Sequence, residues 1–246
     1  MAAVDWSGRA ANARRFIWTA VVEEDRLLLE GDRDRDQVAH HLVELAARDP
    51  DLAVGLDFGF SLPLWFLEER SLEHGMAVSE ETAEGWLRAC PPPFWGRLGR
   101  RRGTEVQHRR TELEVAPRAK PVFQIGGAGS VGTGSLRGFP LLRRLRQEGF
   151  AIWPFDEPRL PVVVEIFPRL LTGPVVKSRF EARQTYLLGR GWPTEASVSE
   201  DAFDAAVSAL MMAAHGGQLA SLTGEPDAVF RREGRIWQPS ELHGPR

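Results

Sequence analysis

Val54-Gly-Leu-Asp-Phe-Gly-Phe-Ser-Leu-Pro63 is an apolar run that ends abruptly in glycine and proline. Apolar residues followed by these turn formers are typical of a buried strand that runs out into a loop. Asp57 stands at the end of the apolar part. A carboxylate buried there without a partner would be strongly unfavourable, so it needs a cation, donated hydrogen bonds or a metal ion. The stretch therefore predicts a central strand that carries a partnered acid at its end.

Three further acids are placed in a similar way. Asp5 follows the apolar run at the start of the chain, Glu165 follows three valines, and Asp204 lies on the inward side of a helical stretch. Asp201 is one turn earlier on nearly the same face of that helix. Ligands of α/β proteins bind at the carboxyl ends of the strands. If the strands of Asp5 and Asp57 are neighbours, we expect their carboxylates within a few ångströms of each other.

The pattern of the whole chain predicts an α/β protein with a central mixed sheet flanked by helices. Stretch 162–167 is continuous and β-branched, as expected of a strand buried on both faces. A capping box from Ser197 to Glu200, or Ser199 alone, would start the last long helix. Strands are predicted at 2–5, 15–23, 26–31, 52–57, 121–125, 150–155 and 162–167, a hairpin at 229–237, and helices at 34–48, 64–73, 79–89, 141–149, 178–188 and about 199–215.

The length allows one large α/β domain or two small ones, and without an internal repeat or a clear linker we expect a single domain over residues 1–246 with an insertion. The formal net charge of −3 gives no global case for affinity to nucleic acid or membranes. Cys90 is the only cysteine, which excludes an intrachain disulfide and a cysteine-rich zinc site. The N-terminus lacks the pattern of a signal peptide, and no apolar run approaches the roughly 18 residues of a membrane span. We therefore expect a cytoplasmic protein without a membrane partner.

The acids together suggest a metal site. A cluster of carboxylates repels itself at neutral pH unless a cation is present. Hard oxygen ligands suit Mg²⁺ or Mn²⁺, and the candidate ligands are Asp5, Asp57, Asp201 and Asp204. Two such ions roughly 4 Å apart can activate water and stabilise the leaving oxygen in phosphodiester cleavage. The alternative is that each acid caps a helix, pairs with an arginine or faces solvent.

Basic residues concentrate in an insertion at about residues 90–120. Between positions 97 and 120, eight Lys or Arg residues stand against three Glu, without a clean periodicity. This predicts an exposed, partly mobile segment. It could contact a nucleic-acid backbone, with Phe94 and Trp95 available for stacking, or it could be a solvated charged loop. The candidate backbone contacts are Arg100, Arg101 and Arg102.

Two loops could bind phosphate. Residues 126–135 form a glycine-rich stretch that contains a formal G-x-G-x-x-G, so the backbone at Gly129 and Ser130 could bind a phosphate, or the stretch could be a flexible loop near the mouth of the site. Ser7, in Asp5-Trp-Ser-Gly8, could belong to the first phosphate loop of an actin-like ATPase or sugar kinase. Such chains usually have two duplicated domains and a second Asp-Gly-Gly loop, which this sequence lacks.

Several short motifs, in this order and context, resemble the family of predicted RNase H-like nucleases. The resemblance covers most of the chain outside the basic insertion. The matching stretches are Val-Asp-Trp-Ser-Gly at 4–8, Gly-Leu-Asp-Phe-Gly-Phe-Ser-Leu-Pro at 55–63, Gly-Phe-Pro-Leu-Leu at 138–142, Ile-Trp-Pro-Phe at 152–155, Val-Glu-Ile-Phe-Pro at 164–168 and Glu-Asp-Ala-Phe-Asp-Ala-Ala at 200–206.

The resemblance implies an RNase H-like fold with a RuvC-type acidic site. The site carries over onto Asp5, Asp57 and Asp204, with Glu165 and Asp201 as further ligands or neighbours of the ligands. In one respect this sequence departs from the nearest RNase H enzymes, which commonly have a glutamate on the first helix or the fourth strand. The fourth strand here offers an aspartate, and the first helix offers only a poorly placed glutamate.

These observations favour a divalent-metal-dependent nuclease or phosphodiesterase that acts on DNA or RNA. Asp5, Asp57, Asp204 and Glu165 are the candidate catalytic residues. A nucleotide-binding phosphotransferase is the alternative among enzymes. A module that binds nucleic acid or protein without catalysis is the alternative from a different class, and carboxylates paired with arginine would favour it.

Overall fold

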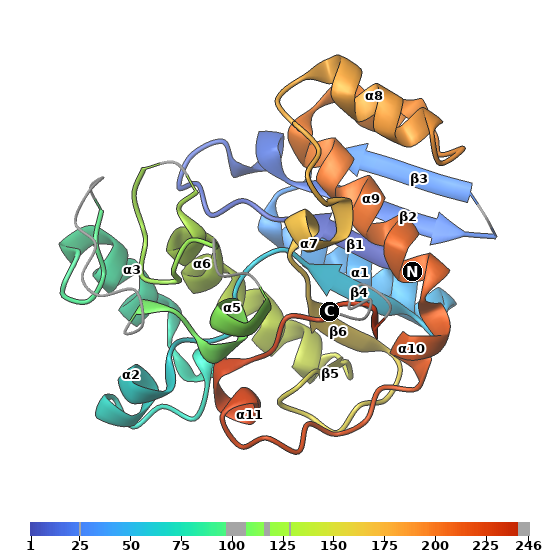
Figure 1. Cartoon of the computed structure of the whole chain (residues 1–246). Helices are drawn as coiled ribbons and strands as arrows, with labels where there is room; N and C mark the ends of the chain where they lie inside the picture. Colours follow the sequence, from blue (N-terminus) through green and yellow to red (C-terminus); the bar gives the residue numbers. More distant parts are fainter. Residues whose placement is uncertain (25, 97–106, 116–118, 128, 241–246) are drawn as a thin grey trace.

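The computed structural model of the chain describes residues 1–24, 26–96, 107–115, 119–127 and 129–240. Within these residues the centre is a six-stranded mixed sheet in the order β3-β2-β1-β4-β6-β5 (Figure 1). The first three strands form an antiparallel meander, whereas β1, β4, β6 and β5 run parallel to one another. The strands are β1 (Ala2–Asp5), β2 (Trp18–Glu23), β3 (Arg26–Gly31), β4 (Ala53–Leu56), β5 (Ala151–Ile152) and β6 (Val162–Glu165).

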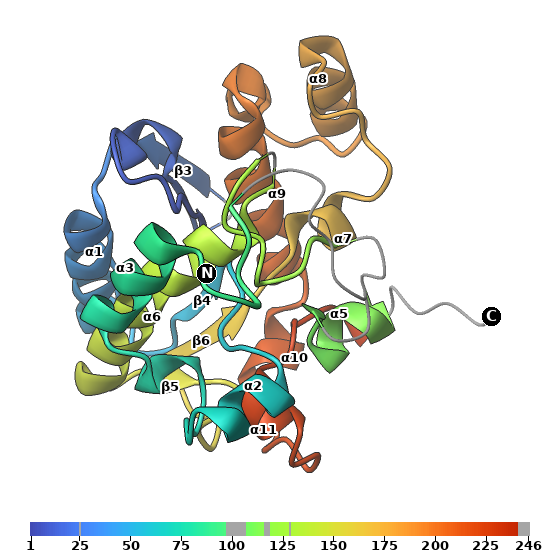
Figure 2. The same cartoon turned by 90° about the vertical axis from the view of Figure 1, so that its left-hand side faces the viewer.

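Helices cover both faces of this sheet. α1 (Arg35–Arg48) and α6 (Val131–Gln147) lie on one side, and α9 (Glu200–Ala214) lies on the other (Figure 2). Successive side chains of a strand alternate between the two layers, so Val4 packs with α1 and α6 whereas Ala3 belongs to the apolar cluster of α9. The prediction of an α/β protein with a mixed sheet between helices is thus confirmed.

The shorter helices surround this framework. α2 and α11 lie side by side in both views (Figures 1 and 2). No helix in the described part of the chain is long and apolar enough to cross a membrane. The shorter helices are α2 (Leu64–Glu69), α3 (Glu80–Ala89), α5 (Arg110–Val115), α7 (Pro168–Thr172), α8 (Phe180–Leu188), α10 (Gly216–Ala220) and α11 (Phe230–Glu233), with 3-10 turns at Ala13–Phe16, Gly75–Ala77 and Thr194–Val198.

Side-chain caps fix where α1 and α9 begin. The Asp34 carboxylate accepts the N–H of Gln37 at 2.8 Å, and the Gln37 side chain accepts the N–H of Asp34 at 2.9 Å. At the start of α9 the Ser199 hydroxyl accepts the N–H of Ala202 at 2.9 Å. Of the two predicted starts for this helix, the structure has the Ser199 cap, which places Asp201 in the first turn.

The glycine-rich segment departs most from the predicted elements. The sequence predicts a loop over 126–135 and a helix from 141, but α6 already begins at Val131 and continues through Pro140. Glycine costs a helix about 1 kcal/mol relative to alanine. Here it allows close packing, because a Cβ on Gly132 would meet Ile125 at 2.8 Å and one on Gly138 would collide with the ring of Phe58. Packing therefore outweighs helix propensity in this segment.

The predicted hairpin at 229–237 is wrong. The segment contains α11, and an isolated bridge joins Ile236 to Glu165. Glu233-Gly234 suggests a hairpin turn in the sequence, but Glu233 is buried and its carboxylate accepts the backbone N–H groups of Leu64 and Arg110, both at 2.6 Å. These long-range contacts determine the path of the segment.

Other element boundaries also differ from the predictions. The stretch 121–125 is a turn with one isolated bridge, between Gln124 and Trp95, rather than a strand. β5 covers only two of the residues predicted at 150–155, and α2 ends four residues before the predicted end at 73. These segments lie outside the long periodic elements, and in such segments the local sequence pattern determines the secondary structure least.

The predicted exposed insertion is wrong for the part that the structure describes. Residues 107–112 include buried side chains, and Arg109 is among the largest fully buried side chains of the chain. Its partners Glu112 and Glu165 neutralise it, and Glu165 is 56 residues away in sequence. A charge count cannot detect such a partner. The predicted backbone contacts, Arg100, Arg101 and Arg102, lie outside the described residues.

Candidate functional site

Asp5 and Asp57 meet at the carboxyl ends of adjacent parallel strands. β1 and β4 pair with Val4 opposite Leu56, and the N–H of Asp57 donates to the carbonyl oxygen of Val4 at 3.1 Å. Continuing this register places Asp5 beside Asp57, on strands about 4.8 Å apart. Residues opposite each other in a parallel pair face the same side of the sheet. The two carboxylates therefore share one side, as the sequence predicts.

α9 brings a third acid over this pair. Asp57 has the same parity along its strand as Gly55, which faces α9. A Cβ on Gly55 would meet the Sδ of Met212 at 2.6 Å, so glycine allows the helix to lie close to the strand. Asp204 precedes Met212 by about two helical turns and lies on the same side of α9. Asp5, Asp57 and Asp204 thus converge from two strands and one helix.

Burial makes negative charge costly at this position. Asp5 is 9% exposed, Asp204 is 8% exposed and Asp57 is half-buried. Burial and the neighbouring Asp57 and Asp204 carboxylates raise the pKa of Asp5 well above its usual range. Burial and Asp204 raise the pKa of Asp57 to about 7, although a hydrogen bond with Asp5 opposes the rise. Without another cation, the ionised forms of Asp5 and Asp57 are therefore disfavoured.

Asp201 completes what we call the acid cluster, which consists of Asp5, Asp57, Asp201 and Asp204. Asp201 is half-buried in the first turn of α9. Burial and the charge of Glu200 raise its pKa, and its own charge adds to the rise at Asp5. The positive end of the helix dipole favours acids in this turn. Asp201 is therefore an electrostatic neighbour of the other three.

Lys177 supplies positive charge to the acid cluster. Its Nζ donates to Oδ2 of Asp204, and its charge opposes the rise that burial imposes on the pKa of Asp5 and Asp57. Lys177 lies between α7 and α8. Arg183 of α8 fixes this segment by donating to the carbonyl oxygens of Lys177 and Ser197.

The donor chemistry of the acid cluster suits a hard divalent cation. All of its ligand atoms are carboxylate oxygens. Oδ1 of Asp204 is buried and has no hydrogen-bond partner among the described residues, so one oxygen is available for an ion. As the side chains stand, however, no group of three or more His, Cys, Asp or Glu in the described residues is placed to hold a metal together. The acid cluster therefore has suitable ligand atoms, but these atoms are not placed around a common ion position.

Glu165 belongs to a different network. It lies at the end of β6 with the parity of Val163, which packs in the cluster of α1 and α6. Arg109 donates to both of its carboxylate oxygens, through Nη1 at 2.8 Å and through Nη2. The N–H of Phe60 also donates to Glu165 at 2.9 Å. Burial raises the pKa of Glu165, and Arg109 opposes that rise. Glu165 is therefore an arginine-paired acid, the arrangement that the sequence argument associates with a structural role.

Asp57 opens into a cavity of about 260 Å³, which we call the Asp57 cavity. Gly129 and Ser130 line it, so two residues that the sequence assigns to phosphate binding lie at the same cavity as Asp57. The Ser130 hydroxyl donates to the carbonyl oxygen of Gly127, and the N–H of Val131 donates to the carbonyl oxygen of Gly129. Lys120 adds a positive charge to the wall.

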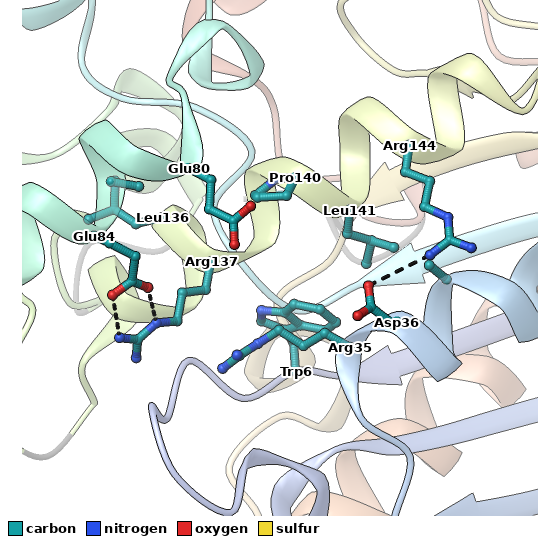
Figure 3. Close-up of a pocket in the computed structure, with 12 residues that line it drawn as sticks. Trp6, Arg35, Asp36, Glu80, Glu84, Leu136, Arg137, Pro140, Leu141 and Arg144 are labelled. Carbon is teal, nitrogen blue, oxygen red and sulfur yellow. Dashed lines mark hydrogen bonds and ion pairs between the residues drawn. The ribbon is translucent and has the colours of Figure 1, made fainter.

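A second cavity of about 300 Å³ lies beside the loop that follows Asp5 (Figure 3). Trp6 lines both cavities, and the guanidinium of Arg35 lies over its ring at 5.8 Å from the centroid. Arg137 pairs with Glu84 in this cavity, at 2.7 Å from Nε to the carboxylate. The figure shows acids and arginines distributed around the same opening. The mixed charge gives this cavity no clear preference for an anion.

The loop that contains Ser7 is held by these arginines. Arg35 donates to the carbonyl oxygens of Ser7 at 2.9 Å and Arg9 at 2.6 Å, and Arg137 donates to that of Gly8. The Ser7 hydroxyl accepts the N–H of Arg9 at 3.3 Å. Ser7 is buried, and these contacts make it a residue that shapes the loop after Asp5.

Sequence reasoning missed the two cations that neutralise the predicted acids. Arg109 lies in a stretch assigned to an exposed insertion, and no local pattern marks it as buried. Lys177 carries one usable signal, because it is one of only two lysines in the chain. Scarcity alone does not distinguish a functional residue from a compositional bias.

Comparison of the chain with models of protein families, with curated proteins and with solved structures finds no match.

Proposed function

We propose that this chain is an RNase H-like nuclease or phosphodiesterase that depends on Mg²⁺ or Mn²⁺. The convergence of Asp5, Asp57 and Asp204 is the observation that supports the proposal most, because buried acids of like charge favour a cation between them. The mixed sheet is compatible with the RNase H-like fold that the sequence motifs imply. The substrate would be nucleic acid.

The acid cluster would hold the ion through Asp5, Asp57 and Asp204. A divalent ion bound there would activate water and stabilise the leaving oxygen of a phosphodiester. Asp57 faces both the cluster and its cavity, so it would connect the ion to the substrate. Lys120 would attract the phosphate backbone to the wall of this cavity. Arg109 and Glu165 also line this cavity and would maintain the shape of its wall.

A module that binds nucleic acid or protein without catalysis is the second candidate function. The observation that favours it is that protein cations already neutralise two of the candidate acids. Lys177 binds Asp204, and Arg109 binds Glu165. On this view the carboxylates stabilise the fold, and added metal would have no effect.

Hydrolysis of phosphodiesters with matched variants separates these candidates. Wild type, Asp5→Asn and Asp51→Asn would be assayed with bis(p-nitrophenyl) phosphate, single-stranded DNA and single-stranded RNA, each in Mn²⁺, in Mg²⁺ and in EDTA. Asp51 is an exposed acid before β4, at the end opposite to Asp57, so Asp51→Asn is a control for loss of a carboxylate. We expect metal-dependent cleavage that falls about 100-fold or more in Asp5→Asn and is unchanged in Asp51→Asn.

Two results would contradict the nuclease. Cleavage at equal rates in EDTA and Mn²⁺ would remove the metal from the reaction. Nucleic-acid binding without cleavage, unaffected by Asp5→Asn, would support the binding module instead.

A further inference from the structure

Both lysines of this chain lie at the proposed site. The sequence contains 31 lysine and arginine residues, of which only Lys120 and Lys177 are lysine. Lys120 lines the Asp57 cavity, and Lys177 contacts Asp204. Arginine presents a planar fork of donors, whereas lysine is a compact charge on a flexible stem. Both lysines are thus cations of the kind that exchanges partners more easily than an arginine does.

Lys177 makes a contact that can be exchanged. Its ammonium binds Oδ2 of Asp204, while the buried Oδ1 of the same carboxylate has no hydrogen-bond partner within the described chain. The Lys177 side chain is 20% exposed and that of Asp204 is 11% exposed, so the ammonium lies toward solvent. Arg183 holds the carbonyl oxygen of Lys177. The side chain can therefore turn outward while the backbone stays in place.

One ammonium does not balance the acid cluster. Four carboxylates and one ammonium leave an excess of negative charge when all are ionised. The charge of Lys177 interacts electrostatically with Asp5 and Asp57, but within the acid cluster only Asp204 accepts a hydrogen bond from it. A divalent ion carries twice the charge of an ammonium group and can be coordinated by carboxylate oxygens of several acids at once. It would therefore gain more from the ionised cluster than the ammonium does.

We propose that Lys177 is a built-in counter-ion that closes the acid cluster in the absence of metal and leaves Asp204 when a divalent ion binds. The inference rests on the proposed metal-dependent function and adds the event that prepares the site. It accounts for the lack of a group of described acids placed to hold an ion together. Metal and ammonium compete for the same carboxylate.

Calorimetric titration of Mn²⁺ into matched variants tests this competition. Lys177→Met removes the ammonium but retains a side chain of similar length. Arg179→Met removes one positive charge from an exposed position two residues away and serves as the control. We expect Mn²⁺ to bind about tenfold more tightly to Lys177→Met than to wild type, and the control to stay close to wild type. Unchanged or weaker binding in Lys177→Met, with wild type binding normally, would overturn the inference alone.

A second measurement uses the wild type and so does not depend on the folding of a variant. An amine-acylating reagent would be applied in EDTA and in Mg²⁺, and the modified peptides quantified by mass spectrometry. We expect Mg²⁺ to accelerate acylation of Lys177 severalfold relative to Lys120, because the displaced ammonium is exposed. Equal or slower acylation in a protein that binds the metal would contradict displacement. If neither wild type nor Lys177→Met binds metal at all, the proposed function fails together with the inference.

Discussion

The substitution Asp57→Asn should stabilise the metal-free protein at neutral and alkaline pH. The pKa of Asp57 rises from its ordinary value of 3.8 to about 7, because of burial and the charge of Asp204. The folded protein thus binds this proton more tightly than the unfolded chain does. The resulting contribution to stability is complete below the unfolded pKa and is lost as the pH rises through about 7.

The size of the effect follows from the shift. A rise of about three pKa units corresponds to ~4 kcal/mol at pH values above 7. Asparagine cannot ionise, so it resembles the protonated acid at every pH. Asp57→Asn should therefore be close to wild type at pH 4 and more stable by up to ~4 kcal/mol at pH 8. For a chain of this size, such a gain raises Tm by about 5–15 °C.

The assay is a set of thermal and urea melts of wild type, Asp57→Asn and the exposed control Asp51→Asn. Melts in EDTA between pH 4 and 8 should show a gap that widens with pH only for Asp57→Asn. In saturating Mn²⁺ the order should reverse, because only the wild type retains all the carboxylate ligands that the ion stabilises. A large loss of stability for Asp57→Asn in EDTA at pH 8, together with no effect of metal on the wild type, would refute the reasoning. It would show that Asp57 serves a structural pair.

Two further predictions concern other cations of the chain. Arg109→Met should destabilise the protein by about 3–5 kcal/mol in urea melts, because it leaves the buried carboxylates of Glu112 and Glu165 without their cation. The control Arg110→Met changes an exposed neighbour and should cost less than about 1 kcal/mol. Equal losses in the two variants would mean that the buried network contributes no more to stability than an exposed ion pair. Replacing Arg100, Arg101 and Arg102 together by alanine should weaken nucleic-acid binding and reduce the slope of log affinity against log salt concentration by about one unit per lost phosphate contact. An unchanged slope would assign this stretch to a solvated loop.

The central part of the site could be predicted because it follows from short-range rules. Apolar runs that end in an acid identified Asp5 and Asp57, and the parallel pairing of β1 with β4 aligns them without any other information. Asp204 could be predicted from the inward stripe of a long helix with a clear cap. Each of these inferences depends on periodicity within a single element.

Glu165 illustrates how a strand-end acid can be assigned to the wrong side. In β6 the residue at the end of the strand pairs with Leu56, which is one position before Asp57. Ile166 therefore takes the place beside Asp57, and Glu165 points toward Arg109. A shift of one residue exchanges the two faces of a sheet. The register between β4 and β6 is set by contacts far apart in sequence, so it could not be fixed in advance.

The glycine-rich start of α6 could not be predicted for a related reason. Its glycines are poor helix formers when considered alone, and their value lies in contacts with other elements. Phe58 packs against Gly138, and the carbonyl oxygen of Gly134 accepts the indole N–H of Trp6 at 3.1 Å. Both aromatic residues directly follow a strand-end aspartate. The helix thus packs against the loops that leave the acid cluster, and tertiary contacts override local propensity.

Arg109 and Lys177 have different consequences for the acids that they neutralise. Arg109 uses several donors to bind Glu112, Glu165 and the carbonyl oxygen of Glu233, so losing any one partner leaves the guanidinium held by the others. Lys177 bonds to a single carboxylate oxygen, and its side chain reaches solvent. A metal ion that binds Asp204 therefore has to displace only the contact with Lys177. An ion that binds Glu165 would have to break the whole hydrogen-bond network of Arg109. This difference, more than the identity of the acids, separates the side chains that can become ligands from the one that stays structural.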